Sequence, residues 1–153
     1  MGVFAINVTA QTQPAHGMHW FPTFGIGQRT PINLAIGQVG LGGEYIFRPG
    51  IGLGGDVAYL SALRDFGSGV GVVSVNGSYH FASSGTIDPF IKGGYTGFVA
   101  FGSAHGMNFG GGLNRWLNDR IALRLEFVDD VALELRTRHY LLGRIGFTFG
   151  HRP

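Results

Sequence analysis

The chain has 153 residues and a net charge of +2 without a basic cluster, so its length is typical of one domain and its charge gives no indication of nucleic-acid binding. Charged residues make up only 13%, about half of the usual globular share, and 28 residues are glycine without a Gly-X-Y period, which excludes collagen. The absence of cysteine excludes disulfides and thiol catalysis, and no run of about 18 apolar residues predicts a transmembrane helix.

Residues 1–19 are predicted as a lead that precedes the folded domain. They begin with a short apolar stretch in which Val8 and Ala10 sit where a signal peptidase prefers small residues, so the stretch has the character of a signal-peptide remnant. A basic region that would start a full signal is missing from it. An ordinary strand with Phe4 and Ile6 on one face is the alternative, and the sequence leaves both interpretations open.

Beyond the lead, apolar and polar residues alternate with a period of two, which is typical of half-buried strands. Near the C-terminus, for example, Leu123 and Leu125 lie on one face and Arg124 lies on the other. The sequence therefore predicts an all-β fold, an eight-stranded antiparallel up-and-down barrel over residues 20–149, with a short tail at 150–153. The predicted strands are 20–28, 37–47, 51–61, 69–81, 89–101, 106–117, 119–128 and 138–149.

The predicted connections alternate between a shorter and a longer set. In an up-and-down barrel these two sets lie on opposite rims, and outer-membrane barrels have short periplasmic turns and longer outer loops. With eight strands, both chain ends then lie on the rim of the short turns, which predicts two periplasmic termini. The shorter set is 48–50, 82–88 and 118–119, and the longer set is 29–36, 62–68, 102–105 and 129–137.

Alternation alone does not decide whether the apolar face points inward, as in a soluble lipocalin-like barrel, or outward to lipid. The polar face carries too few charges to solvate a whole exterior, because soluble surfaces are usually about 25–35% charged. Three acidic and three basic side chains suit a closed interior in which every charge has a partner. The alternative is that they are solvated surface charges. The predicted interior charge network is Glu44, Asp56, Lys92, Arg124, Glu126 and Arg144.

Aromatic residues of the apolar face collect near the predicted strand ends, which favours lipid because amphipathic rings prefer the two bilayer interfaces. The predicted strand lengths also match the roughly 9–11 residues that cross a bilayer at a tilt. The girdle predicted at the short-turn rim is Trp20, Tyr45, Phe47, Tyr79, Phe81, Phe147 and Phe149. The girdle predicted at the opposite rim is Tyr59, Phe101, Phe109 and Phe127.

The C-terminal third resembles a known family. The stretch 108–117, with Gly110-Gly111-Gly112 ahead of a tryptophan, and the following stretch 119–127 are similar to the penultimate hairpin of small OmpA-type outer-membrane barrels. The last strand, which ends in 146–149, resembles the aromatic-terminated strand that the barrel-assembly machinery recognises, although four further residues follow here. The resemblance implies residence among outer-membrane lipid, assembly by that machinery and a plugged barrel. The oligomeric state stays open.

Some barrels of this size are lipid-modifying hydrolases, which need a histidine, a serine and a carboxylate close together. His139 is the candidate base, but no serine follows it, and the Ser103–His105 pair has no neighbouring carboxylate in the sequence. We therefore expect a structural protein whose outer loops are available for contacts, with no catalytic activity, metal or cofactor. A soluble ligand-binding barrel and, after it, a lipid-modifying hydrolase are the alternatives.

Overall fold

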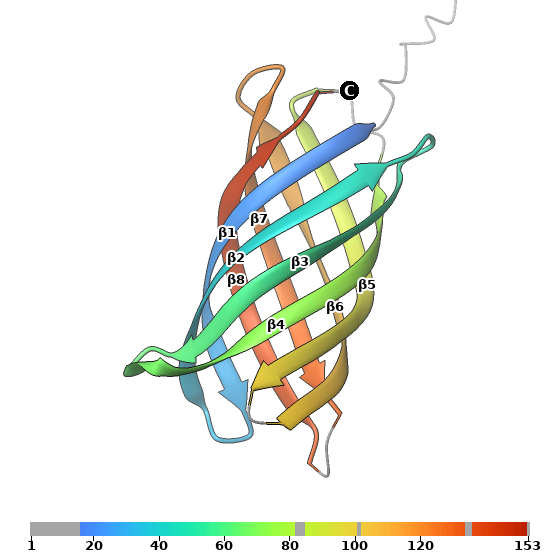
Figure 1. Cartoon of the computed structure of the whole chain (residues 1–153). Coiled ribbons are helices and arrows are strands. Elements are labelled where there is room, and N and C mark those ends of the chain that lie inside the picture. The colour runs from blue at the N-terminus through green and yellow to red at the C-terminus, as the bar shows by residue number, and fades with distance from the viewer. Residues whose placement is uncertain (1–15, 82–84, 101, 134–135, 153) are drawn as a thin grey trace, which may run out of the picture.

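The computed structural model describes residues 16–81, 85–100, 102–133 and 136–152, which fold into eight antiparallel strands (Figure 1). Each strand pairs with the next, and β8 pairs with β1, so the sheet closes into a barrel. Among these residues no helix could cross a membrane. The strands are β1 Gly17–Thr30, β2 Leu34–Ile46, β3 Ile51–Ala62, β4 Asp65–His80, β5 Ile87–Ala100, β6 Gly102–Trp116, β7 Ile121–Ala132 and β8 Arg138–Phe149.

The predicted eight-stranded up-and-down barrel is confirmed, but several boundaries of the predicted elements are wrong, since β6 already begins at Gly102 and β7 ends only at Ala132. β1 begins at Gly17, so the end of the predicted lead belongs to the barrel. β4 begins at Asp65, four residues before the predicted strand. The predicted signal remnant lies almost entirely within residues 1–15, which are outside the described residues.

We call the end of the barrel where β1 begins and β8 ends the terminal rim, and the opposite end the hairpin rim (top and bottom in Figure 1). The prediction of longer loops at the hairpin rim is wrong. The connections there are 31–33, 63–64, 101 and 133–137, whereas those at the terminal rim are 47–50, 81–86 and 117–120.

Strand pairing at the hairpin rim continues through segments whose composition is typical of turns. Tyr59 explains this in the β3–β4 hairpin, where its hydroxyl lies 2.5 Å from the carbonyl oxygen of Phe66 and accepts from the Gly69 backbone nitrogen at 3.0 Å. A bulge between Leu60 and Ala62 adjusts the register there. The hairpin rim therefore consists of protruding strand ends rather than long loops.

The strands are staggered around the barrel. Register partners followed from strand to strand, starting at Trp20, return to β1 at Thr30, ten residues further along. Such a stagger requires strands tilted by about 40° from the barrel axis, so one residue advances roughly 2.5 Å along that axis. The height of a residue in the wall follows from this path and not from its distance to the strand end.

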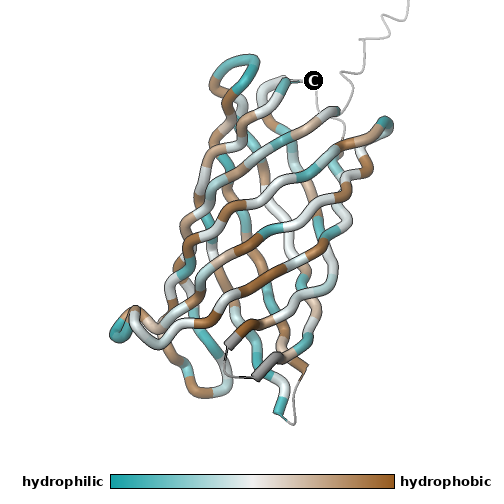
Figure 2. The backbone as a smooth tube through the Cα atoms, viewed as in Figure 1, coloured by the Kyte–Doolittle hydropathy of each residue, from teal (hydrophilic) through white to brown (hydrophobic). Residues whose placement is uncertain are grey.

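Hydrophobic and hydrophilic residues follow one another along the strands (Figure 2), and their side chains alternate between the two faces of the wall. Val75 and Leu125 are 58% and 42% exposed on the outside, whereas Arg124 and Glu126 are 1% and 5% exposed on the inside. The apolar face therefore points away from the barrel axis and the charged face points toward it. This is the reverse of a soluble barrel, whose apolar side chains meet in the centre.

Candidate functional site

The outer wall carries exposed large apolar side chains in every strand, and together with those of the connections they number more than thirty among the described residues. Between Ile87 near the terminal rim and Ile26 toward the hairpin rim, they form an apolar band on the order of 25 Å tall, estimated from the strand tilt. This is the height of the apolar band of outer-membrane barrels. Water would meet an apolar patch far larger than soluble monomers expose.

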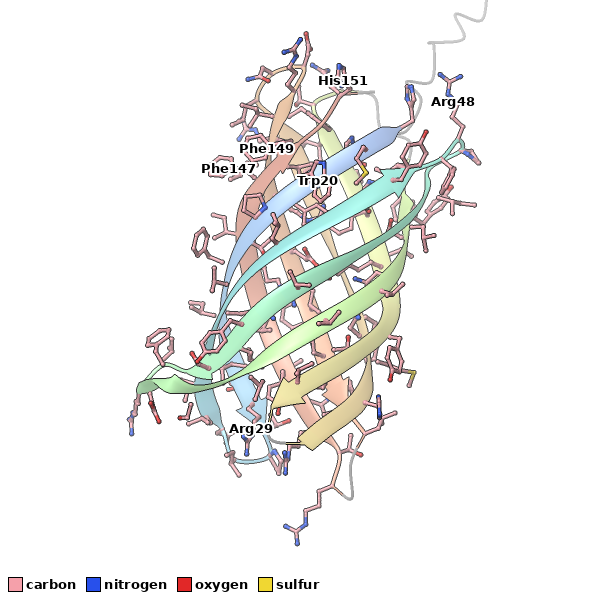
Figure 3. The ribbon with its side chains drawn as sticks, in the orientation of Figure 1. Trp20, Arg29, Arg48, Phe147, Phe149 and His151 are labelled. Atoms are coloured by element: carbon pink, nitrogen blue, oxygen red, sulfur yellow. The ribbon has the colours of Figure 1, made fainter. Side chains whose placement is uncertain are left out.

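The seven aromatic residues predicted for the short-turn rim all lie exposed near the terminal rim. Trp20 is the register partner of Phe149, and Figure 3 shows both beside Phe147. The rings of Tyr45 and Phe47 pack edge to face at 4.9 Å, as do those of Tyr79 and Phe81 at 5.1 Å.

The second predicted girdle differs from the structure. Along the register path, Phe109 and Phe127 both lie nearer the terminal rim than Ile26, so neither reaches the hairpin rim. Tyr59 lies closer to that rim, and Phe101 lies outside the described residues. Phe24 and Tyr95 are exposed at heights between Phe127 and Tyr59, and sequence reasoning missed them because height depends on the stagger.

All six side chains of the predicted charge network lie inside the barrel, and ion pairs join them into one chain. Arg124 Nε lies 3.1 Å from Glu126 Oε2, and its Nη1 lies 3.5 Å from Glu44 Oε1. Lys92 contacts Glu126 and lies 3.7 Å from Asp56 Oδ2. Arg144 joins the same two carboxylates at 3.7 and 3.6 Å.

The network extends further than the sequence indicated. His80 Nδ1 lies 3.0 Å from the Asp88 carboxylate, and His80 Nε2 lies 3.3 Å from Glu44. At the other end, Arg144 Nη2 donates to Asp130 at 3.2 Å. The sequence predicts Asp88 and Asp130 in connections, but both lie within strands and point inward. The alternation of inward and outward residues along a strand indicates their inward position, but it can be applied only once the strand boundaries are known.

Apolar side chains fill the interior near the hairpin rim, where the charge network ends. This plug consists of Ile36, Leu60, Val72, Phe98, Ala132, Tyr140 and Leu142. At the terminal rim, Gly150 and Arg152 bond to the backbone of the β6–β7 turn at 3.0 and 2.9 Å, and His19 packs against Trp116 with ring centroids 5.6 Å apart. The described interior is therefore occupied along its length.

The two faces of the wall change character at the same height. Outward positions beyond the apolar band include the polar residues Gln28, Thr30 and His105, while the inward positions at that level belong to the plug. A barrel in water has polar side chains on its outer face and apolar side chains on its inner face. The height at which the two faces reverse indicates where an apolar environment around the barrel would end.

The predicted catalytic candidates do not assemble into a triad. His139 has a carboxylate partner that the sequence did not reveal, since its Nδ1 lies 2.8 Å from Asp129 Oδ2 on the outer wall. His105 contacts the Tyr95 hydroxyl, and the Ser103 side chain lies outside the described part of the structure. Among the described residues, no serine hydroxyl bonds to either histidine.

No protein-family model and no curated protein sequence matches the chain. Among solved structures, the N-terminal β-barrel domain of Pseudomonas aeruginosa OprF aligns over 88% of this chain and 97% of that one, with a TM-score of 0.65 and 14% identity. Neisserial surface protein A aligns over 87% and 96%, with a TM-score of 0.74 and 7% identity.

The outer membrane protein OprG from Pseudomonas aeruginosa aligns over 94% of this chain and 100% of that one, with a TM-score of 0.59 and 13% identity. This chain has the fold of the small eight-stranded outer-membrane β-barrels. At these identities the likeness concerns the outer-membrane barrel fold and not the chemistry of individual residues.

Proposed function

We propose that this protein is a structural outer-membrane barrel that spans the bilayer as a sealed cylinder. The apolar outer wall with a charged interior supports this proposal most directly, because each of the six network charges has an ion-pair partner inside. Buried charges without partners would cost too much free energy to persist. Outside the wall, an apolar band with aromatic residues at its terminal edge suits lipid.

The proposed barrel is not a diffusion pore. Eight strands enclose a space that side chains alone can fill. Here the charge network fills the middle, and the plug around Phe98 and Tyr140, whose ring centroids are 5.3 Å apart, fills the hairpin end. We expect no passage of sugars and no catalytic turnover.

The proposed orientation places the terminal rim, and both chain ends, in the periplasm. The apolar band reaches the turns at the terminal rim, whereas the strands continue past it at the hairpin rim, as in the β3–β4 hairpin. The hairpin rim would then face outward and offer strand ends, rather than long loops, for contacts. β8, with outward Phe147 and Phe149 at its end, would be the strand that the assembly machinery recognises.

Membrane fractionation combined with a heat-modifiability gel tests membrane residence. The expected result is recovery with outer membranes and faster migration of the unheated protein, because the closed barrel resists detergent. Monodisperse protein without detergent would overturn the proposal and favour a soluble ligand-binding barrel. A sugar-swelling assay in liposomes tests the seal, and swelling above that of empty liposomes would contradict it.

Orientation is tested with single cysteines, since the natural chain has none. Ile32→Cys places a thiol in the exposed β1–β2 turn at the hairpin rim, and Arg48→Cys places one in the exposed β2–β3 turn at the terminal rim. In intact cells, an impermeant maleimide is expected to label the first variant only. Labelling of the second alone would reverse the proposed orientation.

A further inference from the structure

Asp129 lies on the outer wall, where a carboxylate is out of place. Its register partners are Phe109 and Leu141, which face outward with it, and the next outward residue of β7 toward the terminal rim is Phe127. Among the described residues it is the only carboxylate on the outer face of the apolar band. Ionisable side chains at membrane depth are costly and usually mark a functional site.

Only one oxygen of the Asp129 carboxylate has a hydrogen-bond partner among the described residues. Oδ2 lies 2.8 Å from His139 Nδ1, while Oδ1 is buried and has no such partner in the described part of the chain. Asp129 is only 9% exposed, so the wall around it shields this oxygen. An unsatisfied buried acceptor costs free energy that a ligand with a hydrogen-bond donor would recover.

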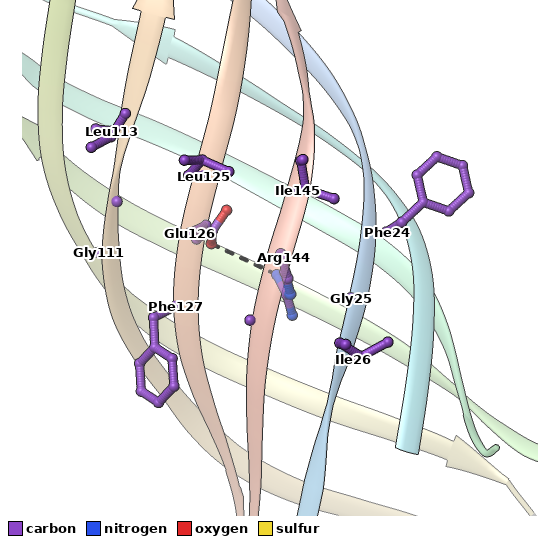
Figure 4. Close-up of a pocket in the computed structure, with 12 residues that line it drawn as sticks. Phe24, Gly25, Ile26, Gly111, Leu113, Leu125, Glu126, Phe127, Arg144 and Ile145 are labelled. Atoms are coloured by element: carbon purple, nitrogen blue, oxygen red, sulfur yellow. Dashed lines mark ion pairs between the residues drawn. The ribbon is translucent and has the colours of Figure 1, made fainter. Parts of the chain in front are cut away.

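A groove of about 610 Å³ lies on the outer wall, and Asp129 is the next outward residue of β7 beyond Phe127, which lines it. Figure 4 shows Leu125, Ile145 and Phe24 along one side of it, with Phe127 and Ile26 on the other. Gly143 lines it as the register partner of both Phe127 and Ile26, and a Cβ at Gly143 would meet nothing closer than 3.9 Å. A side chain added at Gly143 would therefore enter the groove without meeting the wall.

Asp129 borders the groove on the side of the hairpin rim. The row of outward register partners just beyond Phe127, Gly143 and Ile26 consists of Asp129, Leu141 and Gln28. A chain that lay over Gly143 would therefore have its polar end beside Asp129 and Gln28. Within a bilayer an apolar groove gains little from contact with an acyl chain, because lipid tails are equally apolar. Selection of one lipid must come from this polar border.

We propose that Asp129, held by His139, binds the hydroxyl or amide group of a hydroxyacylated glycolipid, the chemistry of outer-leaflet lipid A, while one acyl chain lies in the groove over Gly143. The inference rests on the proposed function, which places the hairpin rim outside. A hydroxyl or amide N–H can donate to the unpartnered Oδ1, whereas a phosphate would be repelled by the carboxylate. Phosphatidylcholine with unsubstituted chains has neither a hydroxyl group nor an N–H and lacks this donor.

The test is native mass spectrometry of the purified full chain in detergent, with lipid A or phosphatidylcholine with unsubstituted chains added at equal concentration. We expect lipid A to be retained at least tenfold more than phosphatidylcholine. Asp129→Leu removes the acceptor and Gly143→Leu fills the groove, and each is expected to abolish the preference.

The matched control is Gly77→Leu, which adds the same side chain at an open outward glycine of β4, where a Cβ would meet nothing closer than 4.0 Å. It is expected to keep the preference for lipid A. Heat-modifiable migration of every variant separates loss of the site from loss of the barrel. Equal retention of both lipids by the folded natural chain, or an unchanged preference in folded Asp129→Leu or folded Gly143→Leu, would overturn the proposal.

Discussion

Arg124 and Glu126 are neighbouring inward residues of β7, and the Arg124 guanidinium donates from Nε to Glu126 Oε2 at 3.1 Å. The same guanidinium is sandwiched between the rings of Phe21 and Phe90, with its central carbon 4.1 and 4.0 Å from their centroids. Aromatic faces attract a guanidinium that has lost its water. Arg124 therefore joins the charged and aromatic parts of the interior.

Arg124→Ala is expected to destabilise the barrel by about 3–5 kcal/mol, because Glu44 and Glu126 lose a buried partner and two aromatic rings lose their packing. Urea unfolding in detergent, followed by tryptophan fluorescence, measures the change. Arg48→Ala is the control, since Arg48 is exposed in the β2–β3 turn. An effect of Arg124→Ala as small as that of the control would contradict the role of the network.

Gly94→Ala is expected to destabilise the barrel by about 1–3 kcal/mol through overpacking. A Cβ at Gly94 would lie 1.9 Å from the Val75 carbonyl oxygen, so the backbone of two strands would have to shift. Gly77→Ala, whose new methyl meets open space, is expected to be neutral or to stabilise by about 0.5–1 kcal/mol because glycine weakens a strand. Thermal unfolding of both variants in the same detergent checks the difference, and a reversed order would refute it.

Ending the chain after Phe149 is expected to cost about 1–3 kcal/mol, since each backbone hydrogen bond contributes roughly 0.5–1.5 kcal/mol. The tail makes two such bonds, from Gly150 to Arg120 and from Arg152 to Asp119. It also covers His19, whose Nε2 lies 3.3 Å from the His151 carbonyl oxygen. The midpoint of heat modifiability measures the loss, and an unchanged midpoint would mean that the tail does not seal the terminal rim.

The sequence predicted which face of the wall a side chain lies on better than it predicted the height of that side chain along the barrel axis. Because the side-chain period of a strand is two and one face is charged, Glu44 and Arg124 could be placed inside without any knowledge of strand pairing. The positions of Phe109 and Phe127 along the axis could not be predicted in this way, because the ten-residue stagger is a property of all eight strand pairs together.

The ends of the strands were also predicted poorly from the sequence. The segment 65–70 contains two glycines and a serine, a composition typical of a turn, yet it pairs with β3 because Tyr59 bonds to its backbone. Asp130 was assigned to a loop because polar residues at a strand end are read as the start of a connection. Its inward position follows from the strand parity once β7 is known to extend to Ala132, and there Arg144 donates to it. Long-range contacts of this kind leave no mark in the local sequence.

The reversal of the two faces near the hairpin rim predicts where the bilayer ends. Val75→Arg puts a charge in the apolar band and is expected to cost about 2–4 kcal/mol, whereas Gln28→Arg puts one beyond the band and is expected to cost about 0–1 kcal/mol. Both positions are exposed, so packing inside the barrel stays the same. Reversible unfolding from phospholipid vesicles measures the two values. In detergent micelles, which adapt their shape, the difference is expected to shrink. Equal destabilisation by the two substitutions in vesicles would contradict a bilayer boundary between the heights of Val75 and Gln28.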